Sequence, residues 1–407
     1  MVPAQPAGDV PPRDGRLPLS AVQTVPTTPF GIYVHVPFCT TRCGYCDFNT
    51  YTAEELGEGV SRGSYAETLV QELRLARSLL GADVPAVSSV FFGGGTPTLL
   101  PAEHLGHILA EISELFGLAA DVEVSTEANP ETVTPRYFEH LRAAGFTRIS
   151  LGMQSAVPKM LEILDRRHRP GRPQEAVGEA RAAGFAHVNL DLIYGTPYET
   201  EEFWQQSLDA AISAEPDHIS AYALVVEPGT ALARQVASGV VPPPDDDAMA
   251  DRYIQADEVL ARAGYRWYEV SNWARGADAV CRHNVLYWRD QNWWGAGPGA
   301  HSHIGGVRWW NVKHPARYAA LLERGESPAA GRETLTPRAR ALEKVMLGVR
   351  LAEGLAMTEI DEPAQRKTLD LLSWGLIDGP ALDAGRIVLT QRGRLMADAV
   401  VRELVAD

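Results

Sequence analysis

The feature that most constrains the fold is a repeated alternation of short apolar segments with longer amphipathic ones between residues 31 and 226. Six segments are rich in β-branched and aromatic residues, as buried strands are, and each ends in polar or glycine-rich residues. The stretches between them have the periodicity of amphipathic helices. The six predicted strands cover 31–38, 88–95, 121–130, 146–155, 187–197 and 218–226.

Six successive strand–helix units predict a parallel sheet with right-handed crossovers. A closed barrel of this type uses eight units, so six predict an open or partial barrel. In one connecting helix, Thr134 is the expected N-cap, Pro135 takes the first helical position and Gly145 closes the helix. The predicted fold class is α/β: a partial six-unit barrel, then a mixed α/β extension and a small winged-helix-like C-terminal domain.

Changes in composition divide the chain into four predicted parts. The Pro-rich segment 1–28 is predicted to be a disordered tail. The barrel core is expected to cover 29–240 and to end where three prolines precede three aspartates. An aromatic-rich extension follows over 241–330, with a helix expected at 248–263. The last part, 331–407, is predicted to contain helices and a short strand pair.

Composition argues against several classes of function. The chain has 37 basic and 52 acidic residues, a formal net charge of −15, which is unlike a nucleic-acid or anionic-lipid surface. No uninterrupted apolar run approaches the ~20 residues that a membrane span needs, and the N-terminal sequence lacks the pattern of an export signal. We therefore expect a cytoplasmic protein with no nucleic-acid partner and no membrane span, whose cysteines meet a reducing environment.

Three of the four cysteines lie within eight residues, in the sequence CTTRCGYC that follows the first predicted strand. This spacing brings the sulfurs of Cys39, Cys43 and Cys46 around one point from a single loop. A zinc site usually has a fourth Cys or His from a matching pair, and none stands in register. A 4Fe–4S cluster held by three thiolates instead leaves one iron open for a small molecule. The sequence therefore favours one iron–sulfur cluster per chain over zinc.

The cysteine motif resembles that of the radical S-adenosylmethionine (SAM) enzymes, in which the amino and carboxylate groups of SAM chelate the open iron. The longer stretch YVHVPFCTTRCGYCDFNTY is similar to one branch of them, the oxygen-independent coproporphyrinogen III oxidases and the related heme chaperones. The similarity covers nearly everything from Phe30 to the C-terminus. It implies that the cluster and SAM are cofactors, and it links the chain to porphyrin biosynthesis.

Polar groups at the ends of the predicted strands mark the rest of the site, because ligands of parallel α/β folds bind there. Glycines in the turn GGGTP at 93–97 allow a close approach of the backbone to a ligand. Asp191 and Gln154 suit ribose hydroxyls, and Arg166 suits a carboxylate. The resemblance implies that these residues contact SAM, with two tyrosines beside it. The predicted SAM-binding residues are Tyr33, Tyr45, Gly94, Gly95, Thr96, Glu127, Gln154, Arg166 and Asp191.

The aromatic-rich segment CRHNVLYWRDQNWW contains the pattern H-N-x-x-Y-W, which is characteristic of the heme-chaperone branch. Imidazole is a common axial ligand of heme iron, and flat aromatic rings offer area for a porphyrin face. His283 is therefore the expected iron ligand, while Cys281 could serve as a thiolate or be a buried small residue. The predicted heme-binding residues are His283, Asn284, Tyr287 and Trp288.

Three functions stay open, and the resemblance favours a heme chaperone that binds heme and delivers it to apo-hemoproteins. The alternative is an oxygen-independent coproporphyrinogen III oxidase, which forms protoporphyrinogen IX by oxidative decarboxylation. Against it, Phe48 stands where the oxidases have a further cysteine, and only the Pro-rich segment precedes the first strand. The third is a scaffold that does not use its cluster. The sequence assigns no catalytic residue and leaves open whether the protein is an enzyme, which hemoprotein receives heme, and whether it forms a homodimer.

Overall fold

The computed structural model describes residues 8–56 and 61–405. At its centre, six parallel strands lie side by side in sequence order, so the predicted α/β fold with six parallel strands is confirmed. Parallel pairing makes the carboxyl ends of all six meet at one edge of the sheet. The strands are β1 (Phe30–Val36), β2 (Val87–Gly94), β3 (Leu118–Ala128), β4 (Arg148–Gln154), β5 (His187–Tyr194) and β6 (His218–Ala223).

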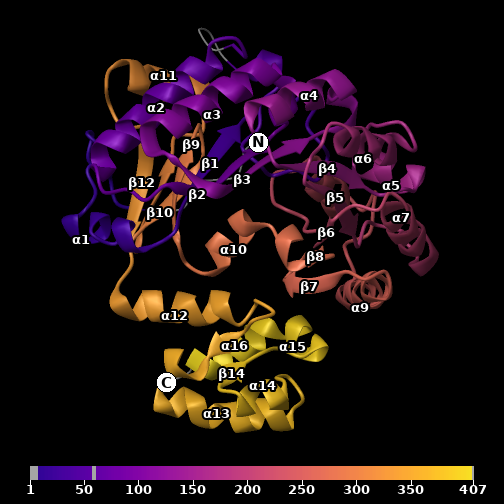
Figure 1. Cartoon of the computed structure of the whole chain (residues 1–407). Coiled ribbons are helices and arrows are strands. Elements are labelled where there is room, and N and C mark those ends of the chain that lie inside the picture. The colour runs from indigo at the N-terminus through magenta and orange to yellow at the C-terminus, as the bar shows by residue number, and fades with distance from the viewer. Residues whose placement is uncertain (1–7, 57–60, 406–407) are drawn as a thin grey trace.

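Helices connect these strands and cover the outer, convex face of the curved sheet (Figure 1). The third of them has the predicted boundaries: the Thr134 side chain accepts from the Tyr137 N–H at 3.2 Å, and Gly145 closes the helix with a φ of 106°. A left-handed φ of this kind favours glycine because it has no Cβ. The helices are α2 (Tyr65–Leu80), α3 (Ala102–Phe116), α4 (Pro135–Ala144), α5 (Pro158–Ile163), α6 (Arg172–Ala182), α7 (Glu201–Ser213) and α8 (Ala231–Ala237).

The extension enlarges the sheet at both edges. Strand β9 (Asn292–Ala296) pairs parallel with β1, and β10 (His301–Ile304), β11 (Val307–Asn311) and β12 (Ala329–Thr334) follow it antiparallel. On the other side, β8 (Asn272–Ala274) and β7 (Arg266–Glu269) continue from β6. The ends of this twelve-stranded sheet, β12 and β7, do not pair, so the barrel stays open. The helix expected at 248–263 is present as α9 (Asp246–Arg262), and α11 (Pro315–Glu323) packs on α2.

Helix α10 (Arg282–Trp288) lies in the hollow of the sheet (Figure 1). A buried ion pair holds this region: Arg148 Nε lies 3.1 Å from Glu123 Oε2, and the Arg148 guanidinium also donates to the Ala279 carbonyl. Glu123 Oε1 accepts from the backbone N–H of His283 at 3.2 Å. Since Arg148 begins β4, α10 fills the hollow near the amino ends of the strands.

The C-terminal residues form a smaller unit with its own hydrophobic core, which includes Val345, Leu371 and Leu404. In Figure 1 it lies below the open side of the sheet, and Arg394 Nη2 reaches Asp257 of α9 at 2.6 Å. The winged-helix-like arrangement stays a prediction. None of the described helices is long and apolar enough to cross a bilayer. The elements are α12 (Pro337–Gly348), β13 (Leu355–Ala356), α13 (Glu362–Ser373), α14 (Gly379–Asp383), β14 (Arg386–Ile387), α15 (Gln391–Leu395) and α16 (Ala397–Val405).

The prediction of a disordered tail is wrong for residues 8–28, while residues 1–7 lie outside the described part of the chain. Asp9 exchanges two backbone hydrogen bonds with Arg332, at 2.8 and 2.9 Å. Ala21, in the short helix α1 (Leu19–Val22), and Val25 are each 1% exposed. The physical reason is the edge strand β12, whose unpaired backbone groups bind the Pro-rich segment.

One buried carboxyl joins the extension to the core. Glu72 of α2 is 0% exposed and accepts from the Gly297 N–H at 2.8 Å, from Asn311 Nδ2 at 2.8 Å and from the Tyr318 hydroxyl. Burial raises the pKa of Glu72 to about 7, against the opposing effect of these hydrogen bonds. The carboxyl therefore holds its proton in the folded protein at a pH where an unfolded chain has released it.

We predict that this carboxyl makes the folded protein less stable as pH rises from about 4.5 to 7. Over that range the folded state binds more protons than the unfolded state, which lowers the free energy of unfolding by on the order of 3 kcal/mol. Glu72→Gln removes the titration, so its stability relative to wild type should increase across this window in urea unfolding curves. The exposed Glu114→Gln is the control, and parallel pH profiles for wild type and Glu72→Gln would contradict the prediction.

Candidate functional site

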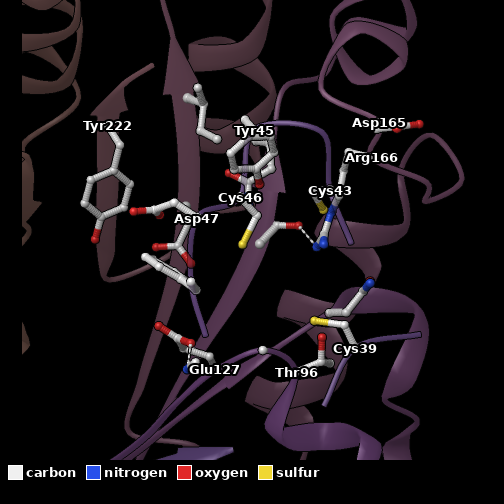
Figure 2. A pocket seen from close by; sticks show the side chains of 18 of the residues that line it. Cys39, Cys43, Tyr45, Cys46, Asp47, Thr96, Glu127, Asp165, Arg166 and Tyr222 are labelled. Atoms are coloured by element: carbon white, nitrogen blue, oxygen red, sulfur yellow. Dashed lines mark hydrogen bonds between the residues drawn. The ribbon is translucent and has the colours of Figure 1, made fainter. Parts of the chain in front are cut away.

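A cavity of about 450 Å³ opens at the carboxyl ends of the parallel strands. All three clustered cysteines line it, together with residues that end β2, β3, β4, β5 and β6. Figure 2 shows Cys39, Cys43 and Cys46 around the same space, with Arg166 on one side and Glu127 on the other. The topology of the sheet thus brings residues that are far apart in sequence to one place.

The cysteines lie on the loop that follows β1. Each is free and partly exposed to the cavity. Backbone hydrogen bonds hold the loop at two points: the Cys39 N–H donates to the Tyr51 carbonyl at 3.0 Å, and the Leu232 N–H donates to the Gly44 carbonyl at 2.8 Å. Among the residues that the structure describes, no three His, Cys, Asp or Glu side chains are close enough together to hold a single metal ion.

The turn after β2 packs directly against the cysteine loop. Gly95 N–H donates to the Val36 carbonyl at 2.8 Å. A Cβ on Gly95 would stand 2.5 Å from the Phe38 carbonyl oxygen and 3.1 Å from Cys39 Sγ, so a larger residue would push the loop away. Gly94 has a φ of 113° and donates its N–H to Glu127 Oε2 at 3.0 Å. The backbone of this turn therefore lies close to the cysteine loop, as only a residue without a Cβ allows.

Two carboxyls face the cavity, away from bulk solvent. Burial, with a further contribution from Asp191, raises the pKa of Glu127 to about 8. The pKa of Asp191 is also raised by burial, although Ser150 Oγ and Asn189 Nδ2 donate to it, both at 2.7 Å. Two partly desolvated carboxyls favour a cationic ligand, because a positive charge would stabilise their ionised forms.

A strained backbone position and the guanidinium of Arg166 form part of another wall. Gln154 has a φ of 65°, at an irregularity in the pairing of β4 with β5. Such strain in a non-glycine residue is typical of positions where the fold aims a side chain at a ligand. Arg166 Nη2 donates to the Gly152 carbonyl at 2.9 Å, while its buried Nε has no hydrogen-bond partner among the described residues. The guanidinium therefore keeps a donor for an anionic group.

Eight of the nine residues predicted to bind SAM line this cavity with the cysteines, and Tyr33 does not. Tyr33 lies three residues before the end of β1, and its hydroxyl is 2.9 Å from His35 Nδ1 on the concave side of the sheet. It lines a second cavity instead. The eight that share the first cavity are Tyr45, Gly94, Gly95, Thr96, Glu127, Gln154, Arg166 and Asp191.

The second cavity, of about 530 Å³, adjoins the first. Phe48, Gly94 and Glu127 line both cavities, so they form the wall between them. The other walls come from β1, β9, β10 and β11, from α10 and from α12, which is the segment that leads into the C-terminal unit. This cavity is built where the barrel core, the extension and the C-terminal unit meet.

The four residues predicted to bind heme have different surroundings. Of these, only Tyr287 lines the second cavity, packed edge-on against Trp293 at 4.7 Å between ring centroids. His283 lies behind it, 1% exposed, with Nδ1 2.9 Å from Ser89 Oγ and Nε2 2.8 Å from the Tyr287 hydroxyl. Burial lowers the pKa of His283 to about 4, so the ring is neutral. Asn284 and Trp288 line neither cavity.

Cys281 is not placed to ligate a metal. It is 4% exposed, and its thiol is 3.6 Å from Glu123 Oε1 in the buried network at the amino ends of the strands. Burial first, and then Glu123, raise the pKa of this thiol. The structure therefore favours the reading of Cys281 as a small buried residue.

Sequence reasoning missed several polar residues of the first cavity and of the layer behind it. Asn189 donates to Ser150 Oγ at 2.6 Å and to Asp191 at 2.7 Å, so it orients the carboxylate. Tyr222, at the end of β6, lines the cavity opposite Arg166 (Figure 2). The missed signal is the two-residue period of a strand, which puts Asn189 and Asp191 on one face.

Comparison with known proteins agrees with this geometry. The model of the radical SAM superfamily matches residues 33–211. Heme chaperone HemW of Mycobacterium tuberculosis is 52% identical over 393 residues, 97% of this chain and 99% of that protein. Heme chaperone HemW of a Synechocystis species is 34% identical, over 85% of this chain and 84% of its own length. The structure of coproporphyrinogen III oxidase (HemN) from Escherichia coli has a TM-score of 0.81 at 26% identity, covering 95% of this chain and 92% of that one.

The residues that match the superfamily include the cysteine loop and the ends of β2 to β5, and the M. tuberculosis relative matches almost from end to end. Membership of the superfamily implies a 4Fe–4S cluster and SAM as cofactors. An identity of 52% over nearly the whole length is far above that to the oxidase, which is 26%. The chain therefore belongs to the radical SAM superfamily and, within it, to the HemW family of heme chaperones.

Proposed function

We propose that this protein is a cytoplasmic heme chaperone, which binds heme and delivers it to apo-hemoproteins. The observation that carries the proposal is the second cavity of about 530 Å³, which shares a wall with the cysteine-lined cavity and is faced by Tyr287 and Trp293. Aromatic rings of this kind provide flat apolar area for a porphyrin. The printed name of the M. tuberculosis relative, a heme chaperone, supports the same function.

For the first cavity, we propose that Cys39, Cys43 and Cys46 hold the cluster. The donor set fits it, because three free thiols lie on one loop and line one cavity. A cluster bound by three thiolates supplies an iron with a free coordination position. The chain's own contribution is to fix the loop through Gly95 and Leu232, and to keep a fourth cysteine, Cys281, in the buried network.

The cluster assignment predicts a clear division among the four cysteines. After anaerobic reconstitution, the wild type should contain about four iron and four sulfide per chain. Replacing Cys39, Cys43 or Cys46 by Ala should remove most of both, together with the broad absorption near ~400 nm that iron–thiolate bonds give. Cys281→Ala is the matched control and should retain the full content. Zinc uptake without iron, or cluster loss in the Cys281 variant alone, would contradict the assignment.

We also propose that the eight predicted residues around the first cavity bind SAM, with Tyr33 outside that set. Asp191, held by Asn189 and Ser150, would accept from ribose hydroxyls. Arg166 would pair with the carboxylate through the donor that lacks a partner among the described residues. Glu127 offers a carboxylate to the positive groups of SAM, and its pKa of about 8 would fall when a cation binds.

Substitutions in this set should weaken SAM binding without affecting cluster content. A charge-assisted contact is worth roughly 1.5–3 kcal/mol, so Asp191→Asn or Arg166→Gln should raise the Kd for SAM about ten- to a hundred-fold. Equilibrium binding to the reconstituted protein measures this. The exposed Asp209→Asn and Arg262→Gln have the same chemistry far from the cavity and should bind as the wild type does. If both cavity variants bound SAM with wild-type affinity, the proposed position of SAM in this cavity would be wrong.

The second candidate function is the oxidase activity, which is favoured by the structural likeness to coproporphyrinogen III oxidase (HemN) from E. coli at a TM-score of 0.81. Against it stands Phe48, which is 57% exposed and occupies the wall between the two cavities. By resemblance, the oxidase branch has a further cysteine at this position, and this chain has a phenyl ring instead. Phe48 therefore favours the chaperone over the oxidase, and it lies in the candidate site itself.

A side-by-side assay of the anaerobically reconstituted protein distinguishes these functions. We predict saturable binding of one hemin per chain, followed by the Soret band, and transfer of that heme to an apo-hemoprotein such as apomyoglobin. Decarboxylation of coproporphyrinogen III should be undetectable with SAM and a reductant present. Efficient formation of protoporphyrinogen would show that the protein is an oxidase and would contradict the proposed chaperone function. Hemin binding without saturation would mean adsorption to the aromatic surface and would also count against the chaperone.

A further inference from the structure

We infer that His301, rather than His283, is the axial ligand of heme iron, and that the iron lies in the second cavity. This inference rests on the proposed heme-chaperone function and assigns the atom that binds the iron. His301 begins β10 and lines the cavity together with Tyr287 and Trp293. It lies outside the H-N-x-x-Y-W pattern, so the sequence did not single it out as a ligand.

The histidines near the second cavity differ in whether they have a free ring nitrogen. An axial ligand must present an imidazole nitrogen with an available lone pair to the iron. Three histidines near the cavity use both nitrogens within the protein. His283 bonds to Ser89 and Tyr287, at 2.9 and 2.8 Å. His35 bonds to the Tyr33 hydroxyl and to the Asn49 carbonyl, both at 2.9 Å.

His303 is the third engaged histidine. Its Nδ1 is 3.0 Å from the Gln291 carbonyl, and its Nε2 accepts from the Gly306 N–H at 3.1 Å. It is also 1% exposed. Iron ligation by His35, His283 or His303 would therefore break a buried hydrogen bond and leave its partner unsatisfied, which costs about 1–3 kcal/mol for each group. His35 and His303 therefore serve as parts of the cavity wall, and His283 as a support behind Tyr287.

His301 differs from them in each respect. Its side chain is exposed, and neither ring nitrogen has a hydrogen-bond partner within the residues that the structure describes. The residue is nevertheless held in place: the His301 carbonyl accepts from Trp293 Nε1 at 3.0 Å, and the ring stacks on Trp310 at 5.8 Å between centroids. Partial burial, with Lys313 and Arg308 nearby, lowers the pKa of His301, which favours the neutral ring that ligates iron.

The other walls of the cavity suit a flat apolar ligand. Helix α12 contributes Met346, which is 37% exposed, and Leu347. Arg308 is the one arginine or lysine among the lining residues, and it lies 2.8 Å from Glu343, so these two charges compensate each other. A porphyrin inserted between α12 and β10 would cover Met346, and its iron would face the exposed imidazole of His301.

The test is a hemin titration of the full-length reconstituted protein, comparing His301→Gln with the matched controls His283→Gln and His303→Gln. We expect His301→Gln to shift the Soret band and to weaken hemin binding at least tenfold, since even outer residues of metal sites contribute about 10–100-fold. Added imidazole should restore the wild-type band in His301→Gln, because it can replace the missing ring. The two control variants should keep the position of the wild-type band and one hemin per chain.

The outcomes separate this inference from the proposed function. If the wild type binds one hemin saturably while His301→Gln keeps its band and affinity, the ligand assignment is wrong and the chaperone stands. A lost band in His283→Gln with an unchanged band in His301→Gln would assign the iron to the H-N-x-x-Y-W helix instead. If the wild type itself fails to bind hemin, the proposed function fails, and this inference fails with it.

Discussion

Parallel pairing of β1 to β6 is the constraint on which the rest of the molecule depends. It requires long crossovers, which become the helices of the convex face, and it puts all six carboxyl ends at one edge. The cysteine loop follows the first of these strands, so it closes over the same edge where Glu127, Gln154 and Asp191 emerge. Residues about 150 positions apart in the sequence thereby line one cavity.

Polar groups at that edge are costly to the fold. Burial raises the pKa values of both Glu127 and Asp191, and the charge of Asp191 raises that of Glu127 further. Hydrogen bonds from Gly94, Ser150 and Asn189 offset part of this cost. A protein gains nothing in stability from such an arrangement, which is why partly desolvated carboxyls at strand ends indicate a ligand. Glu72 shows the contrast, because its buried carboxyl is surrounded by donors and joins two parts of the fold.

The sequence was sufficient wherever a residue's place follows from local pattern. Strand periodicity located β1 to β6, and strand ends led to six residues of the first cavity, whereas Tyr45 and Arg166 came from the family resemblance. Tyr33 lines the second cavity and not the first, because it lies within β1, where alternation turns the side chain to the concave side instead of the carboxyl end. His283 and Tyr287 are four residues apart on α10, so one helix face holds both, but only the tertiary structure shows which of them meets the cavity. Ser89, 194 positions away, occupies the other nitrogen of His283.

The two cavities share a wall that contains a titratable carboxyl, so their electrostatic environments are linked. Glu127 and Phe48 face both cavities, so a change of charge in one is felt in the other. A cation beside Glu127 would lower its pKa from about 8 and leave a negative carboxylate next to the space proposed for heme. Phe48 adds an apolar ring at the same boundary, where it would separate a porphyrin in the second cavity from the cysteine loop. A cationic ligand in the first cavity would thus alter the electrostatic environment of the second, and Phe48 stands at the wall between them.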